Sequence, residues 1–85
     1  ILIVEDEGIV ALDIKQSLEA LGYSVCGIAS SGDAALRKAK ALRPDLALVD
    51  VKLQGDMDGI ETAAAVKWLY HTPVIFLTAH ADDET

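Results

Sequence analysis

The sequence has few of the residues that brace small extracellular domains or that break regular structure. Its 85 residues include one cysteine, Cys26, and two prolines, so no disulfide forms within the chain. With 52% hydrophobic residues and so little proline, the chain is expected to fold, and its length fits one small domain. The apolar run around Cys26 predicts a buried, reduced thiol.

Basic residues are also scarce, with 7 lysines and arginines against 14 acidic residues and a net charge of −7. This balance argues against binding of a nucleic-acid backbone by this segment, because such binding needs a basic surface. Apolar runs such as residues 1–4 and 74–77 are far shorter than the roughly 20 residues of a membrane helix. No membrane span or signal peptide is predicted, and a cytoplasmic location is expected. The chain begins without methionine and ends in a charged run, residues 82–85, so a fragment of a longer protein is expected.

Four short apolar runs alternate with three helical patterns along the chain. The runs at residues 1–4, 25–29, 46–49 and 74–77 resemble buried strands. Helical patterns cover residues 10–21, 35–42 and 57–70, and Gly22, Pro44 and Pro73 mark boundaries between elements. This alternation predicts an α/β fold, a doubly wound parallel sheet built from βαβ units.

Polar residues follow three of the predicted strands at the point where each ends. Glu5 and Asp6 follow the first strand, Asp50 the third and Thr78 the fourth. Carboxyl ends of parallel strands share one edge of a sheet, which is where ligands bind in open α/β folds. Carboxylates gathered there repel one another unless a cation compensates, and hard oxygen ligands suit Mg²⁺ or Mn²⁺. The sequence therefore predicts a metal site.

Each of these residues also has a structural alternative. Asp6 has the residue type of a helix cap, and a threonine after a strand is common, so neither Asp6 nor Thr78 is specific alone. Their joint placement with Asp50 favours the functional interpretation.

Other side chains are assigned ordinary structural roles. His71 and His80 have no partner at ligand spacing and are expected on the surface or in loops. Trp68 and Tyr70 are expected to pack on the sheet.

Four short motifs in this order resemble the receiver domain of two-component response regulators, as in chemotaxis regulators. They are residues 1–7, residues 46–50, Met57-Asp58-Gly59 and residues 74–79. The resemblance implies the flavodoxin-like strand order 2-1-3-4-5. It also implies that residues 1–85 are a receiver domain whose fifth strand and last helix are missing from this chain.

The resemblance assigns a role to each site residue. Asp50 would take a phosphoryl group from a histidine kinase or phosphotransfer domain and so switch a downstream output. Asp6 would bind Mg²⁺ directly, Glu5 through water and Lys52 through its backbone carbonyl, while the Thr78 hydroxyl would sense the phosphoryl group. Such a domain is not an enzyme, although it assists its own phosphotransfer, and a hybrid histidine kinase is one expected context. Homodimerisation is a further expectation.

Two departures from the family keep alternatives open. The loop at residues 52–59 lacks the proline common in the family and is slightly lengthened, and the chain stops before the family's fifth-strand lysine and aromatic switch residue. One alternative is a haloacid-dehalogenase-like phosphatase with Asp50 as nucleophile, although those enzymes want an acid where this chain has Lys52. The other is a pseudo-receiver that binds partners without phosphorylation.

Overall fold

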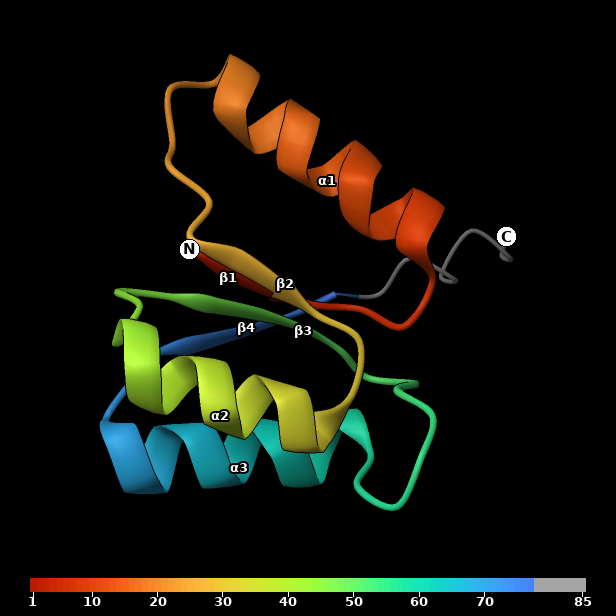
Figure 1. Ribbon diagram of the computed structural model, residues 1–85, viewed down its shortest axis with the longest axis vertical. Helices are drawn as coiled ribbons and strands as arrows, with labels where there is room; N and C mark the ends of the chain where they lie inside the picture. Colours follow the sequence, from red (N-terminus) through yellow and green to blue (C-terminus); the bar gives the residue numbers. More distant parts are fainter. Residues whose placement is uncertain (78–85) are drawn as a thin grey trace.

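The computed structural model, which describes residues 1–77, is a four-stranded parallel sheet between two layers of helix (Figure 1). Helix α1 covers one face, and α2 and α3 cover the other. Strand order is β2-β1-β3-β4, which confirms the α/β fold and the first four strands of the predicted order. No helix in the described residues is long and apolar enough to cross a membrane. The elements are β1 (Leu2–Val4), α1 (Gly8–Ala20), β2 (Gly27–Ala29), α2 (Gly32–Leu42), β3 (Ala47–Asp50), α3 (Gly59–Tyr70) and β4 (Val74–Leu77).

Strand β1 is central, and all three of its residues are buried, as its continuous apolar run predicts. It pairs with β2 and with β3, and the register places Val4 beside Ala29 on one side and beside Val49 on the other. The main core lies between the sheet and helices α2 and α3. Its buried members are Leu2, Val4, Ala29, Ala35, Ala39, Ala47, Val49, Leu53, Ala63 and Val66.

The helices differ in how they begin. Helix α3 begins at Gly59, two residues later than predicted, because Asp58 serves as its N-cap. The Asp58 carboxylate accepts the Glu61 amide at 2.8 Å, and the Glu61 carboxylate accepts the Asp58 amide at 3.1 Å, which makes a capping box. Helix α1 has Glu7 as its N-cap and no side-chain cap, so Asp6 does not have the capping role.

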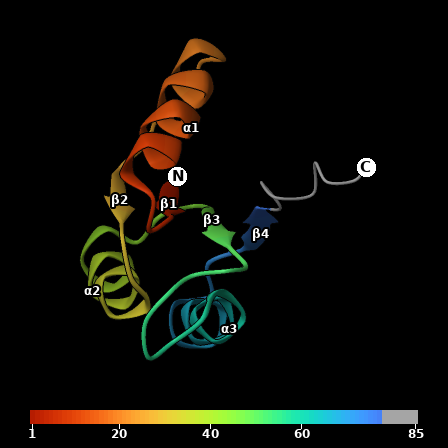
Figure 2. The same ribbon diagram turned by 90° about the vertical axis from the view of Figure 1, so that its right-hand side faces the viewer.

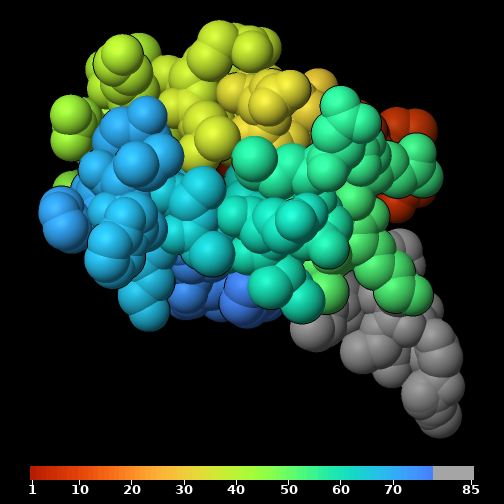
Figure 3. Space-filling model, turned by 90° about the horizontal axis from the view of Figure 1, so that it is seen from below, coloured from red at the N-terminus to blue at the C-terminus, as the bar shows by residue number. Residues whose placement is uncertain are grey.

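Helix α1 stands apart from the other two, as Figure 2 shows from the side. Ala11 is its buried residue, while Ile9 is 87% exposed and Leu12 is also exposed. Helices α2 and α3 lie side by side and together form the face seen in Figure 3. Packing is therefore much denser on the α2 and α3 side of the sheet.

Two predictions about burial are wrong. Cys26 is exposed, because β2 begins only at Gly27, and its thiol lies 3.4 Å from the Ile1 carbonyl oxygen. Trp68 is 82% exposed, because it lies on the side of α3 opposite the residues that face the sheet. Tyr70 does pack against the core, and the Arg43 guanidinium lies 5.2 Å from the centre of its ring.

The last described strand, β4, forms one edge of the sheet. It pairs with β3, and its Ile75 and Phe76 side chains are exposed. Within residues 1–77, β3 is the one strand that pairs with β4, while the predicted absence of a fifth strand stays a prediction. Thr78 and His80 lie outside the described residues, and His71 is exposed, as predicted, at the end of α3.

Candidate functional site

Three carboxylates meet where β1 and β3 end. Asp50 is the last residue of β3, and Glu5 and Asp6 directly follow β1. The parallel register aligns Val4 with Val49, so Glu5 leaves its strand beside Asp50. One oxygen atom from each carboxylate lies within 4.8 Å of the others. The structure thus brings together three residues that the sequence analysis selected, although 44 positions separate Asp6 from Asp50 (50 − 6).

Two of the three carboxylates are almost fully buried. Glu5 is 1% exposed and Asp50 is 2% exposed, whereas Asp6 is half-buried. Each buried carboxylate accepts a hydrogen bond from an amide two residues further along the chain. The Glu7 amide donates to Glu5 Oε2 at 3.1 Å, and the Lys52 amide donates to Asp50 Oδ1 at 3.0 Å. These bonds orient the carboxylates without neutralising their charge.

The third carboxylate is held by a segment distant in sequence. The Gln54 amide, in the loop between β3 and α3, donates to Asp6 Oδ2 at 3.3 Å. This bond ties the loop that follows Asp50 to the end of β1. Sequence reasoning missed it, because a backbone donor leaves no signature in residue type.

The three carboxylates lie so close together that their negative charges repel one another. Burial raises the pKa of Glu5 from its ordinary 4.5 to about 7, and the neighbouring Asp6 and Asp50 carboxyl groups contribute to this rise in pKa. The hydrogen bond from the Glu7 amide lowers the pKa of Glu5 and so offsets part of this rise. A proton on Glu5 is one way to relieve the repulsion, and a bound cation is another.

The donor set fits a hard divalent cation. All three groups offer carboxylate oxygens, which Mg²⁺ and Mn²⁺ prefer over nitrogen or sulfur. A depression beside the carboxylates has a volume of about 270 Å³ and is lined by Asp6, Glu7, Asp50, Lys52 and Gln54. That space accommodates water molecules around an ion, which suits Mg²⁺ because it retains part of its hydration shell.

The remaining predicted site residues have different outcomes. Lys52 does lie at the site, with an exposed side chain on the rim and its amide on Asp50, while a metal-binding role of its carbonyl stays a prediction. Thr78 falls outside the described residues, so its role also stays a prediction.

Gly59, selected from the sequence only as part of Met57-Asp58-Gly59, packs directly against the site. A Cβ atom at this position would collide with the Asp50 carbonyl oxygen and lie 2.8 Å from Val51 Cα. The first turn of α3 therefore packs directly on the backbone of Asp50, which only glycine permits.

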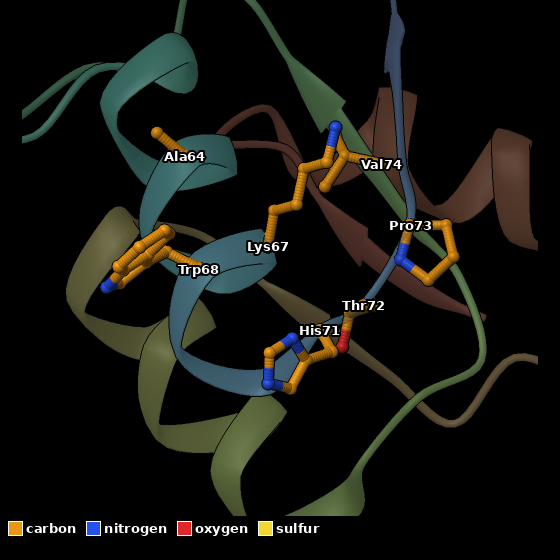
Figure 4. Close-up of a pocket in the computed structure, with 7 residues that line it drawn as sticks. All are labelled: Ala64, Lys67, Trp68, His71, Thr72, Pro73 and Val74. Carbon is orange, nitrogen blue, oxygen red and sulfur yellow. The ribbon is translucent and has the colours of Figure 1, made fainter.

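A second, larger hollow lies between α3 and the start of β4 and has a volume of about 690 Å³ (Figure 4). It is lined by Ala64, Lys67, Trp68, His71, Thr72, Pro73 and Val74. The hollow is at the amino end of β4, whereas the carboxylates are at the carboxyl ends of β1 and β3. Its lining contains no acidic side chain, and it contributes nothing to the site.

Known proteins are similar to this chain in sequence and in fold. Residue positions 1–85 match the family model of the response regulator receiver domain. The chain is 35% identical to the phyllosphere-induced regulator PhyR of Methylorubrum extorquens over 83 residues, covering 96% of this chain and 31% of that protein. It is also 35% identical to the transcriptional regulatory protein PdtaR of Mycobacterium tuberculosis over 79 residues, covering 93% of this chain and 38% of that protein. The chain thus spans about a third of the length of these relatives.

A solved structure gives the same result. The signal receiver domain of a modulated diguanylate cyclase from Desulfovibrio desulfuricans superposes with a TM-score of 0.86 at 47% identity. The match covers 89% of this chain and 61% of that one. The motifs, the strand order, the carboxylates at the sheet edge and these similarities all agree, and the chain belongs to the response regulator receiver domain family of two-component signal transduction.

Proposed function

We propose that Asp50 is the phosphoacceptor of this receiver domain and that Mg²⁺, held by Asp6, Glu5 and Asp50, is required for the transfer. The observation that carries the proposal is the position of Asp50, a buried carboxylate at the end of β3 within 4.8 Å of two other carboxylates. A buried acid beside two like charges is costly for stability, which favours a chemical role.

In the proposed reaction, an Asp50 carboxylate oxygen attacks the phosphorus of a phosphohistidine on a histidine kinase or phosphotransfer domain. An O–P bond forms and the N–P bond breaks, with the electron pair returning to the imidazole nitrogen. The Lys52 amide donates a hydrogen bond to Asp50 Oδ1 at 3.0 Å and so orients the carboxylate for attack. Bound Mg²⁺ would neutralise charge on the carboxylates and on the transferred phosphoryl group.

Phosphorylation would then alter the surface around the depression. An aspartyl phosphate adds about −1.5 to −2 charge units and new hydrogen-bond acceptors beside Asp6 and Lys52. The exposed Lys52 side chain and Gln54 of the adjacent loop line the same depression as Asp50. A downstream output segment would read the difference, and Thr78 is proposed to turn toward the phosphoryl oxygens.

The test is the intact mass of the full-length protein after incubation with acetyl phosphate, with and without Mg²⁺. The proposal expects one phosphoryl group per molecule, dependent on Mg²⁺ and absent in Asp50→Asn. Asp56→Asn is the matched control, since Asp56 is an exposed acid in the same loop, and it should label like the wild type. Labelling that persists in Asp50→Asn would contradict the proposal.

A further inference from the structure

The three carboxylates of the site have the same kind of hydrogen-bond partner but differ in how far away it lies in the chain. Glu5 and Asp50 each accept an amide from two residues ahead. Such bonds are local, because donor and acceptor lie within one turn of the chain. They orient each carboxylate relative to its own strand and give no connection between strands.

The bond to Asp6 is different, because it spans 48 residues. It joins Gln54 in the β3–α3 loop to the end of β1, at a donor–acceptor distance of 3.3 Å. Gly55 follows with φ of 113°, a conformation that favours glycine and turns the chain directly after the donor. The loop is thereby anchored to the carboxylate that lies half-buried at the mouth of the site.

We propose that the backbone amide of Gln54 is a positioning donor for Asp6, which holds one carboxylate oxygen and leaves the other for the divalent cation. This inference rests on the proposed magnesium site. A carboxylate that binds a metal is commonly oriented by a hydrogen bond to its second oxygen, and loss of such a bond typically lowers metal affinity by roughly 10- to 100-fold. Asp6 is half-buried, whereas Glu5 and Asp50 are almost fully buried, so fewer surrounding atoms restrain the Asp6 carboxylate.

The sequence of the loop supports a role for the main chain here. Residues 52–59 contain no proline, so every residue of the loop keeps a backbone N–H. A proline at position 54 would have no N–H and could not bond to Asp6. The Gln54 side chain is exposed, and the bond uses its amide nitrogen, so the proposed role does not depend on which non-proline residue occupies the position.

Two variants of the full-length protein separate the amide from the side chain. Gln54→Pro removes the N–H, and Gln54→Ala keeps it. We expect Mg²⁺ titration by calorimetry to show about tenfold weaker binding for Gln54→Pro and unchanged binding for Gln54→Ala. Thermal unfolding checks that both variants fold. If Gln54→Pro does not fold, a backbone ester at position 54, made by semisynthesis, removes the N–H without the proline ring.

A second measurement needs no metal. Amide hydrogen exchange at Gln54 in metal-free protein should be slowed by the bond to Asp6 and should become faster in Asp6→Ala. Equal exchange in both proteins would overturn the inference.

The titration outcomes also distinguish the inference from the proposed function. Equal Mg²⁺ affinity for Gln54→Pro and the wild type overturns the positioning role and leaves the magnesium site intact. Equal weakening in Gln54→Ala and Gln54→Pro assigns the effect to the side chain and also overturns it. If the wild type itself binds no Mg²⁺, the proposed function and this inference fail together.

Discussion

The two faces of the sheet hold their helices very differently. On one face, α2 and α3 bury seven residues between them, namely Gly32, Ala35, Ala39, Gly59, Thr62, Ala63 and Val66. On the other face, α1 buries Ala11. The chain continues from Asp50 through a loop into α3 of the dense side, whereas Glu5 and Asp6 lead directly into α1. The site therefore joins a firmly packed half to a loosely packed half.

The largest expected effect comes from adding one methyl group to each half. In Gly59→Ala, the new Cβ meets the Asp50 backbone, so we expect a loss of at least about 3 kcal/mol in the free energy of unfolding. In Gly8→Ala at the start of α1, the Cβ meets nothing within 4 Å, so stability should stay level or rise by up to about 1 kcal/mol. Urea unfolding measures both. A similar loss in the two variants would mean that α1 is as tightly packed as α3.

The next largest effect comes from truncating one valine in each half. Val66 of α3 is fully buried, and Val66→Ala should cost about 2 to 3 kcal/mol through lost burial and an unfilled cavity. Val10 of α1 is half-buried, and Val10→Ala should cost less than about 1 kcal/mol. The same unfolding experiment tests the pair, and a larger cost for Val10→Ala would reverse the comparison.

Glu5, in the carboxylate site between the two halves, should make the free energy of unfolding depend on pH by a similar amount. Because the pKa of Glu5 is about 7 in the folded protein and 4.5 ordinarily, the folded state keeps a proton that the unfolded state releases. Without divalent cations, stability should fall as pH rises from about 4.5 to 7 and then level off, by on the order of 2 kcal/mol. Urea unfolding at pH values of about 5 and about 8 measures this.

Glu5→Gln should remove this pH dependence and be the more stable protein at the alkaline end of that range. Asp13→Asn, at an exposed acid of α1, is the control and should keep it. A Glu5→Gln variant with the wild-type pH dependence would show that Glu5 is not the titrating group.

The smallest effect concerns the starts of the helices. Asp58→Ala breaks the capping box of α3 and should cost about 1 kcal/mol. Glu7→Ala at the N-cap of α1 removes no cap bond, so its cost should be close to zero. The change in melting temperature compares them, and equal shifts would contradict the difference between the helix starts.

Most of the fold was predictable because its signals are local. Apolar runs and helical spacing located the strands and helices, and Asp50 was identified by the abrupt change from apolar strand to carboxylate. The errors occurred where local pattern is ambiguous. The run at residues 25–29 is as apolar as a strand, yet β2 begins at Gly27 and leaves Cys26 exposed. Helix α3 carries large apolar residues on its exposed side as well as on its buried side, so its sequence did not show that Trp68 faces outward.

The acidic residues of the site were predictable from the sequence, but the main-chain contacts that hold them in place were not. Parallel strands bring their carboxyl ends to one edge, so the sequence alone was enough to expect Glu5, Asp6 and Asp50 together. The Gln54 amide and the contact of Gly59 with Asp50 depend on how the β3–α3 loop folds back. Main-chain geometry of that kind is set by tertiary packing and has no counterpart in residue pattern.

The parallel register of β1 and β3 has an evolutionary consequence. The pairing of Val4 with Val49 fixes where the acids emerge, whatever the length of the segment that follows. The exposed side chains of the β3–α3 loop can therefore change without displacing Glu5 or Asp50, whereas the Gln54 N–H and Gly59 stay constrained by their contacts with Asp6 and Asp50. Sequence change is therefore expected to be tolerated best at the exposed loop side chains and least at the strand ends, where the register sets the positions of the acids.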